Sequence, residues 1–233
     1  MEYLNVYDNN KNKLDKKIVR GDKLSNDEHI LVAVIFIKNK DNKYLIQKTS
    51  LEKSGLYSTT GGHVLYNEDS KTSIIREVKE ELGIDIANDD IKYIGSILFG
   101  VPFGDIYYLE KDIDIDSVKL QKEEVSSVSY MTKEEIDDLI KKEKITKSHG
   151  LMFKYLCEKM NKKITYVTGN WAKIDSARQI LEPLGFFVDN IKMETIEIQA
   201  DDVEDVAKYS AKWASDKLKC SVLKNDTGLL SKH

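Results

Sequence analysis

A group of three glutamates is the strongest indication of a reactive site in this sequence. Glu77, Glu80 and Glu81 are spaced i, i+3 and i+4, so a helix would place them along one edge. At about 6 Å and an effective dielectric constant of about 20, each pair of carboxylates repels by roughly 2–3 kcal/mol before screening. Arg76 can pair with Glu80 one turn away, but a single guanidinium cannot neutralise three carboxylates. Hard oxygen ligands suit Mg²⁺ or Mn²⁺, so the group predicts a divalent metal site.

The helix that carries the glutamates is predicted from the spacing of its apolar residues. Ile74, Val78 and Leu82 fall within an arc of about 100° on a helix of about 3.6 residues per turn, and this stripe should face a core. Gly83 follows the last turn, where a left-handed cap is favoured. We therefore predict a helix over residues 70–82, with the glutamates on the adjoining edge. An ordinary solvated acidic face is the alternative interpretation of that edge.

The residues from Gly62 to Ile84 form a motif with fixed spacing. They read G-x5-E-x7-R-E-(apolar)-x-E-E-x-G-(apolar), and every defined position is met. Seven fixed letters match by chance on the order of 10⁻⁸ times per starting position. The pattern is the Nudix box, so the first 150 or so residues resemble a Nudix hydrolase domain. The resemblance implies an α/β/α sandwich with a mixed sheet, in which the box forms a loop, a helix and a second loop.

The resemblance also implies roles for the residues of the box. In this family the helix carboxylates hold divalent cations, Mg²⁺ or Mn²⁺, against a phosphoanhydride, and water attacks phosphorus. The metal ligands implied are Glu77, Glu80, Glu81, the backbone carbonyl of Gly62, and Glu68 as support for the loop or the metal shell. Arg76 would orient the glutamates. The cations would screen the diphosphate charge and acidify the water.

The general base that takes the proton from this water stays open between two options. Glu124, or its neighbour Glu123, stands just before a predicted strand and is the first option. Glu80 or Glu81 of the helix is the second. An ordinary exposed loop pair is the alternative interpretation of Glu123 and Glu124.

Three further residues are expected near a substrate. Lys48 is a candidate phosphate contact, and Phe103 and Tyr107 are candidates for stacking on a base. Aromatic residues in short strands usually belong to the core, so a core position is the alternative for both rings.

The first part of the chain is also similar to the isopentenyl-diphosphate isomerase-like branch of the Nudix family. The similarity rests on Val6-Tyr7-Asp8, Arg20-Gly21-Asp22, Leu45-Ile46-Gln47-Lys48 and Gly61-Gly62-His63. True isomerases use a cysteine near the position of Thr60, and neither Cys157 nor Cys220 lies there. Because the box is complete and this cysteine is missing, hydrolysis is expected rather than isomerisation. His29 and His63 are either metal ligands in the isomerase manner or structural residues.

Residues 161–233 form a second segment after a predicted Nudix domain at 1–160. A strand at 164–167 leads through Thr168-Gly169-Asn170 into a helix, whose free N–H groups and Lys173 suit an anion. The order of these residues, with Glu197 and Asp226, resembles the N-terminal half of the inosine triphosphate pyrophosphatase (Ham1-like) family. The resemblance implies that Thr168, Asn170 and Lys173 bind a triphosphate, and that Glu197 and Asp226 serve a metal.

The Ham1-like family continues for about as much chain again beyond this segment. We therefore expect a small α/β half-domain with no activity of its own. A half-sheet ending near Val222 and Leu223 leaves an unpaired edge. This edge is expected to pair with another chain, as in a homodimer, or to be poorly ordered.

Composition excludes several classes of protein. The 233 residues hold 36 Lys+Arg against 40 Asp+Glu, a formal net charge of −4, so no excess of cations is present for nucleic acid. The longest apolar run, 30–37, is too short to span a membrane. The start of the sequence has no secretory signal, and two cysteines form neither a disulfide framework nor a zinc site. A cytoplasmic protein with a small phosphorylated substrate is expected.

The sequence therefore predicts a Mg²⁺- or Mn²⁺-dependent Nudix hydrolase that cleaves a diphosphate linkage in a nucleoside diphosphate derivative or a similar small molecule. One alternative is a non-catalytic nucleotide-binding regulator. Another is a house-cleaning pyrophosphatase that acts on non-standard nucleoside triphosphates. The other predicted elements are strands at 4–7, 30–37, 44–47, 57–60, 91–98, 106–110 and 125–131, a helix at 133–142 with a Thr132–Glu135 capping box, and a helix capped by Ser148 that reaches Met160.

Overall fold

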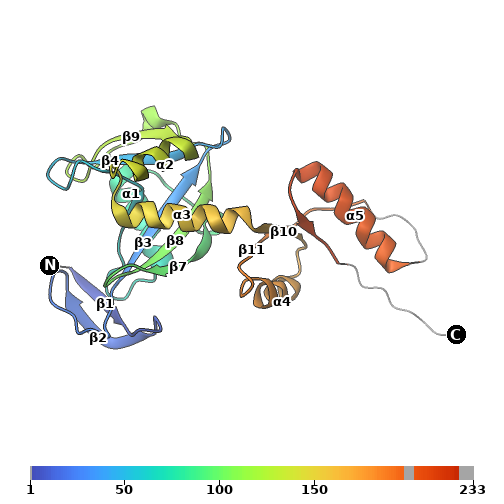
Figure 1. Cartoon of the computed structure of the whole chain (residues 1–233), viewed down its shortest axis with the longest axis horizontal. Coiled ribbons are helices and arrows are strands. Elements are labelled where there is room, and N and C mark those ends of the chain that lie inside the picture. Colours follow the sequence, from blue (N-terminus) through green and yellow to red (C-terminus); the bar gives the residue numbers. More distant parts are fainter. Residues whose placement is uncertain (1, 197–201, 226–233) are drawn as a thin grey trace. The chain divides into compact units, whose positions relative to one another are not determined.

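The computed structural model describes residues 2–196 and 202–225, apart from the side chain of Asp89. The chain forms two compact units, Met1–Leu156 and Cys157–His233. Figure 1 labels the main elements of both. The boundary falls within the helix α3 (Lys147–Asn161).

The first unit is built on a seven-stranded mixed sheet. Its strands are β3 (Leu31–Lys38), β4 (Tyr44–Thr49), β5 (Tyr57–Ser58), β6 (Thr60–His63), β7 (Lys92–Leu98), β8 (Phe103–Glu110) and β9 (Val125–Met131). The order is β5-β4-β3-β8-β7, with β6 also on β3 and β9 also on β4. β3 and β8 run parallel, and the other pairs are antiparallel. Two short 3₁₀ helices, Asn88–Asp90 and Ile115–Ser117, lie in the connections.

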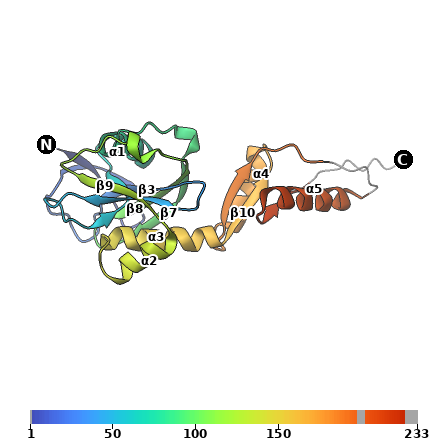
Figure 2. The same ribbon diagram turned by 90° about the horizontal axis from the view of Figure 1, so that it is seen from above.

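Strand β3 is apolar along most of its length because both of its faces are buried. Ala33 and Ile35 belong to the core cluster that also contains Ile74 of the helix α1 (Ser70–Leu82). Phe36 points to the opposite face. Its ring centroid lies 5.4 Å from that of Phe153 in α3. The sheet therefore lies between α1 and α3 (Figure 2), which confirms the predicted α/β/α sandwich with a mixed sheet.

Helix α1 begins and ends where the sequence predicts. The carboxylate of Asp69 accepts a hydrogen bond from the Thr72 amide at 2.7 Å and caps the first turn. Gly83 ends the helix with φ of 69°, a left-handed conformation that glycine adopts without strain. Its amide donates to the carbonyl of Lys79.

A row of residues across the sheet determines where α1 lies. Asp105 on β8 pairs with Ala33 on β3, and Ala33 pairs with Gly62 on β6. The hydroxyl of Ser70, at the start of α1, donates to Asp105 at 2.6 Å and lies 2.7 Å from the hydroxyl of Tyr107. These bonds tie the first turn of α1 to β8, and the following turns contact β3 and β6.

An N-terminal hairpin forms a separate two-stranded sheet of β1 (Tyr3–Tyr7) and β2 (Lys13–Val19). Leu4, Val6 and Ile18 are buried and form a small core of their own. The sequence pattern predicts β1 but not β2, because four of the seven residues of β2 are Lys or Asp.

Other elements differ from the predictions in ways that have local causes. The predicted strand 57–60 is divided between β5, which pairs with β4, and β6, which pairs with β3. Ser148 does not cap α3, because that helix already begins at Lys147. The helix α2 (Lys133–Lys141) has the predicted capping box, in which Thr132 and Glu135 exchange hydrogen bonds.

The second unit holds a three-stranded parallel sheet in the order β11-β10-β12. Its elements are β10 (Lys163–Val167), α4 (Trp171–Leu181), β11 (Phe187–Ile191), α5 (Val203–Leu218) and β12 (Val222–Leu223). Val188 and Ile174 are buried, and they give the unit a core between the sheet and α4. In both units together, no helix of the described residues is long and apolar enough to cross a membrane.

One partly buried histidine, His149, makes the stability of the first unit depend on pH. The Thr59 amide donates to Nδ1 of His149 at 3.1 Å, so this nitrogen carries no proton. Burial lowers the pKa of His149 from 6.5 to about 4. The unfolded chain therefore binds this proton first, and stability is lost as the pH falls from 6.5 towards 4.

We expect His149→Gln to weaken this pH dependence, because glutamine keeps an acceptor for the Thr59 amide but does not titrate. The measurement is urea unfolding of both proteins at several pH values between 4 and 7. If the stability of the variant fell with pH as steeply as that of the wild type, His149 would not be the source of the pH dependence.

Candidate active site

Arg76 binds three carboxylates at the edge of α1. Its Nε and Nη2 donate to the two oxygens of Glu68 at 3.0 and 3.1 Å. Its Nη1 donates to Glu77 and to Glu80 at 2.9 Å each. The predicted pair of Arg76 with Glu80 is thus confirmed. The guanidinium also bridges to the box loop, because Nη2 donates to the carbonyl of His63 at 3.3 Å.

The charges and the burial at this edge shift the pKa values of Arg76 and Glu77. Burial lowers the pKa of Arg76, but hydrogen bonds and charge from Glu68 and Glu77 more than offset it and raise this pKa. Burial raises the pKa of Glu77, and Arg76 opposes that shift. The guanidinium is therefore permanently charged, and it offsets part of the negative charge of the acidic edge.

Glu77 lies directly on the backbone of Gly62. A Cβ atom at Gly62 would stand 2.2 Å from Oε1 of Glu77 and 2.4 Å from its Cδ. A side chain at this position would displace the carboxylate of Glu77, so glycine permits the close approach. Asp105, Ala33 and Gly62 are paired across β8, β3 and β6, and Ser70 of α1 is bonded to Asp105. Glu77 is two helical turns after Ser70, so α1 crosses the sheet and places Glu77 over Gly62 of β6.

Glu81 is held by a chain of two buried polar side chains. It is only 7% exposed, and Nε2 of Gln47 donates to its Oε2 at 3.0 Å. The hydroxyl of Thr60 in turn donates to Oε1 of Gln47 at 3.0 Å. Since the amide oxygen of Gln47 is occupied by Thr60, its NH₂ group must face Glu81. These two residues fix the orientation of the Glu81 carboxylate.

The surroundings of Glu81 favour its protonated form. Burial raises the pKa of Glu81 to about 8, and the bond from Gln47 opposes this shift. The charges of Glu77 and Glu124 raise it further. Glu124 therefore lies within electrostatic range of the helix edge, and it also pairs with Lys53 at 2.8 Å.

The match to protein families agrees with this geometry. Residues 28–156 match the model of the NUDIX domain.

The chain belongs to the Nudix family.

Related proteins extend this finding. An uncharacterized Nudix hydrolase of Listeria innocua is 35% identical over 145 residues, which cover 60% of this chain and 85% of that protein. A crystal structure of the protein DR0079 from Deinococcus radiodurans shares the fold, with a TM-score of 0.56 at 21% identity, over 66% of this chain and 98% of its own. The chain is a Nudix hydrolase, an enzyme that acts on pyrophosphate bonds.

A third relative matches a smaller part of the chain. The dITP/XTP pyrophosphatase of Thermococcus kodakarensis is 40% identical over 67 residues, which cover 29% of this chain and 36% of that protein. The match thus spans about a third of that enzyme.

The Nudix helix offers the donor atoms that a divalent cation prefers, but they are turned to other partners. Nudix hydrolases generally use divalent metals, and the carboxylates of the box are hard oxygen ligands. In the described part of the chain, no three acidic, histidine or cysteine side chains converge closely enough to hold a metal ion. Glu77 and Glu80 bind Arg76, and Glu81 binds Gln47. The carboxylates are of the type that binds a divalent metal, and their role as metal ligands stays a prediction.

The two options for the general base occupy different environments. Glu80 is half exposed and Glu81 is buried, although both belong to the same turn. Glu124 is partly exposed, and its backbone carbonyl accepts a hydrogen bond from the Ser50 amide at 2.8 Å. The side chain of Ser50 donates to the carbonyl of Glu123, so the backbone of this acidic pair is firmly held.

The predicted substrate contacts divide into two groups. Phe103 and Tyr107 are buried in the core cluster beneath α1, and the hydroxyl of Tyr107 is bonded to Ser70. This corrects the expectation that they stack on a base, because neither ring offers a free face. Lys48 lies with its Nζ 5.7 Å from the ring centroid of Tyr57, and it stays a candidate phosphate contact.

Of the two histidines considered as metal ligands, His29 has structural contacts at both ring nitrogens, and the ligand role of the His63 ring stays a prediction. Nδ1 of His29 bonds the carbonyl of Val101, and its Nε2 bonds Oδ1 of Asn9, each at 2.8 Å. His29 therefore connects the hairpin turn to the loop before β8. His63 is half-buried, burial lowers its pKa, and its carbonyl accepts a bond from Arg76.

The predicted triphosphate residues of the second unit form a closed cap. Oδ1 of Asn170 accepts from the amides of Ala172 and Lys173 at 3.0 and 3.4 Å. The hydroxyl of Thr168 accepts from the Asn170 amide at 3.1 Å. This corrects part of the expectation of free N–H groups, because the asparagine side chain already accepts from two of them. Glu197 and Asp226 lie outside the described residues.

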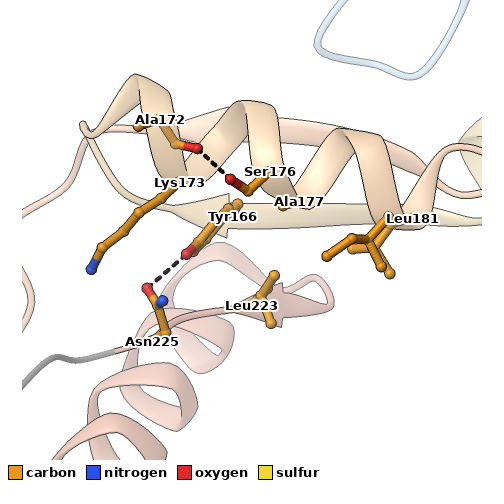
Figure 3. A pocket seen from close by; sticks show the side chains of 9 residues that line it. Tyr166, Ala172, Lys173, Ser176, Ala177, Leu181, Leu223 and Asn225 are labelled. Carbon is orange, nitrogen blue, oxygen red and sulfur yellow. Dashed lines mark hydrogen bonds between the residues drawn. The ribbon is translucent and has the colours of Figure 1, made fainter.

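A cavity of about 550 Å³ lies on the inner face of α4 in the second unit. Figure 3 shows Lys173, Tyr166 and Asn225 at one end and Leu181 at the other. Tyr166 donates to Asn225 at 2.6 Å. The rest of the lining is mostly apolar, so this cavity lacks the acidic side chains of the Nudix box.

The contact between Gly62 and Glu77 predicts a coupled effect on stability. We expect Gly62→Ala to cost about 1–3 kcal/mol, because the new methyl group collides with the Glu77 carboxylate. In a Glu77→Ala background most of this cost should vanish. Urea unfolding of the four proteins in this cycle measures the coupling.

Gly61→Ala is the matched control, because its Cβ would meet the backbone oxygen of Ala33 at 2.4 Å instead. Its cost should be the same in both backgrounds. Equal costs of Gly62→Ala with and without Glu77 would disprove the close contact.

Proposed function

We propose that this Nudix protein is a Mg²⁺- or Mn²⁺-dependent hydrolase that cleaves a diphosphate linkage in a nucleoside diphosphate derivative or a similar small phosphorylated substrate. The observation that carries the proposal is the acidic edge of α1, where Glu77 lies against Gly62 and shares the guanidinium of Arg76 with Glu80, and where Glu81 follows Glu80 in the same turn. A divalent cation bound there would screen the charge of the diphosphate and acidify the attacking water.

The residues of the chain have distinct roles in this proposal. Arg76 keeps Glu77 and Glu80 on the same side of the helix, and it joins them to the box loop through Glu68. The backbone of Gly62 gives Glu77 close access to the strand. The carbonyl of Gly62 and the carboxylates of this edge are the proposed metal ligands.

Two carboxylates remain as proposed general bases. Burial raises the pKa of Glu81 to about 8, so its ionised form is a stronger base than an ordinary carboxylate, and a cation bound at this edge would favour that ionised form. Glu124 acts on Glu81 through its charge and is more exposed to solvent. We favour Glu81, because Gln47 and Thr60 hold its carboxylate in one orientation.

The likeness of the N-terminal stretch to the isopentenyl-diphosphate isomerase-like branch is part of the same proposal. Thr60 occupies the position near which isomerases carry a cysteine, and its hydroxyl is bonded to Gln47. A threonine committed to this bond does not transfer protons as a thiol does, which supports hydrolysis rather than isomerisation.

A second candidate function is the removal of non-standard nucleoside triphosphates. It is favoured by the partial match to a dITP/XTP pyrophosphatase, which we assign to the second unit as a Ham1-like half. Because Asn170 closes the start of α4, we expect no hydrolysis by this unit alone. Pairing of its β12 edge with another copy, as in a homodimer, is the accompanying expectation.

Turnover separates an enzyme from a nucleotide-binding regulator. We expect wild type with Mg²⁺ to hydrolyse at least one member of a panel of nucleoside diphosphate derivatives and non-standard triphosphates. Glu80→Gln and Glu81→Gln should lower kcat/KM by about 10²-fold or more, because each loses a charge at the acidic edge. The exposed Glu52→Gln is the control and should keep full activity. Binding of nucleotides by wild type without any turnover would favour the regulator.

Removal of divalent metal should abolish this turnover. We expect EDTA to stop hydrolysis and Mg²⁺ or Mn²⁺ to restore it, while Ca²⁺ should restore less because it prefers more ligands at longer distances. The measurement is phosphate or nucleotide release after dialysis. Full activity in the metal-free protein would contradict the assignment of the carboxylates.

A further inference from the structure

The β1–β2 hairpin is held against the loop of the Nudix box by direct hydrogen bonds. The Tyr66 amide donates to the carbonyl of Tyr3 at 2.7 Å. The fully buried side chain of Asn5 donates to the carbonyls of Leu65 and Glu68 at 3.1 and 3.2 Å. The hairpin and the box loop therefore present one continuous surface.

This surface carries exposed aromatic rings with cations beside them. Tyr3 is 41% exposed and Tyr66 is 37% exposed. Nζ of Lys17 lies 4.6 Å from the ring centroid of Tyr3 and 5.4 Å from that of Tyr66. Nζ of Lys13 lies 5.6 Å from the Tyr66 ring. We call these four residues the hairpin platform.

The lysines of the hairpin platform are not engaged by carboxylates. No ion pair found among the described residues includes Lys13 or Lys17. Asp15 alternates with them along β2 and shares their face. Lys16, on the opposite face, is paired with Glu28 at 2.6 Å. Two ammonium groups thus remain available to an anion, in a chain whose net charge is negative.

The end of the hairpin lies next to the acidic edge. Arg20 pairs with Glu2 at 2.7 Å. This hydrogen bond lowers the pKa of Glu2, and the charges of His63 and Arg76 add to the effect. Direct contacts make the same connection, because Asn5 of the hairpin donates to the carbonyl of Glu68 at 3.2 Å, and the carboxylate of Glu68 accepts from Arg76 of the acidic edge at 3.0 Å. A molecule whose diphosphate lies at the acidic edge can therefore extend over Arg20 onto the hairpin platform.

We propose that the hairpin platform binds the nucleoside end of the substrate, with the base stacked on an exposed tyrosine and the phosphate next to the ribose paired with Lys17 or Lys13. The inference rests on the proposed function and narrows it to substrates that carry a base. Every base has a π face, so stacking on tyrosine tolerates different bases. A ligand on either ring lies within reach of Lys17, because that ammonium stands beside both.

Calorimetry with two probes tests this assignment in the presence of Mg²⁺. ADP carries a base and a diphosphate, whereas inorganic pyrophosphate carries the diphosphate alone. We expect Tyr66→Ala to weaken ADP binding about tenfold and to leave pyrophosphate binding unchanged. Tyr66→Phe keeps the aromatic face and should restore ADP binding to within about threefold of wild type.

The matched pair for the cations is Lys17→Ala and Lys16→Ala, on opposite faces of one strand. The first should weaken ADP binding and reduce its salt dependence, and the second should change neither. Unchanged ADP binding by Tyr66→Ala, or an equal loss for both probes, would overturn the hairpin platform while the proposed function stands. A wild-type protein that binds neither probe would overturn both.

Discussion

A single guanidinium faces three carboxylates at the edge of α1, and the rest of the site is arranged around this imbalance. Arg76 binds Glu68, Glu77 and Glu80, so the edge stays net negative even when every bond to the arginine is made. Such an arrangement is costly in a stable protein unless an additional cation relieves it. In the function that we propose, this imbalance has a use, because Arg76 keeps the carboxylates together and leaves charge that a divalent ion would offset.

The position of this edge depends on how α1 is fixed on the sheet. The first turn is anchored by the bond from Ser70 to Asp105, and the last turn ends at the left-handed Gly83. Between them, Ile74 and Val78 are fully buried in the core. Polar anchors set the register of the helix, and apolar packing sets its height above the sheet. A helix held in this way gives its carboxylates a rigid support, and Arg76 adds the bonds to the box loop.

Local features of the sequence predicted α1 and its acidic edge, because periodicity, the Asp69 and Gly83 caps and the pairing of neighbouring turns all act over a few residues. The bond between Gln47 and Glu81 joins residues 34 positions apart, and nothing in the strand around Gln47 distinguishes it from an ordinary polar residue. The burial of a strand residue also depends on contacts that are distant in the sequence. Phe103 is buried because β8 lies between β3 and β7, which local sequence does not reveal.

Glu81 shows how burial and function are combined at one residue. A carboxylate that is 7% exposed loses most of its hydration, and this loss favours the protonated form. Gln47 returns part of the lost solvation through one hydrogen bond, and Thr60 guarantees that the amide presents its NH₂ group rather than its oxygen. If the amide turned over, its oxygen would face the carboxylate and disfavour ionisation further. The two polar residues therefore keep the ionised form of Glu81 accessible inside the fold, which a general base or a metal ligand requires.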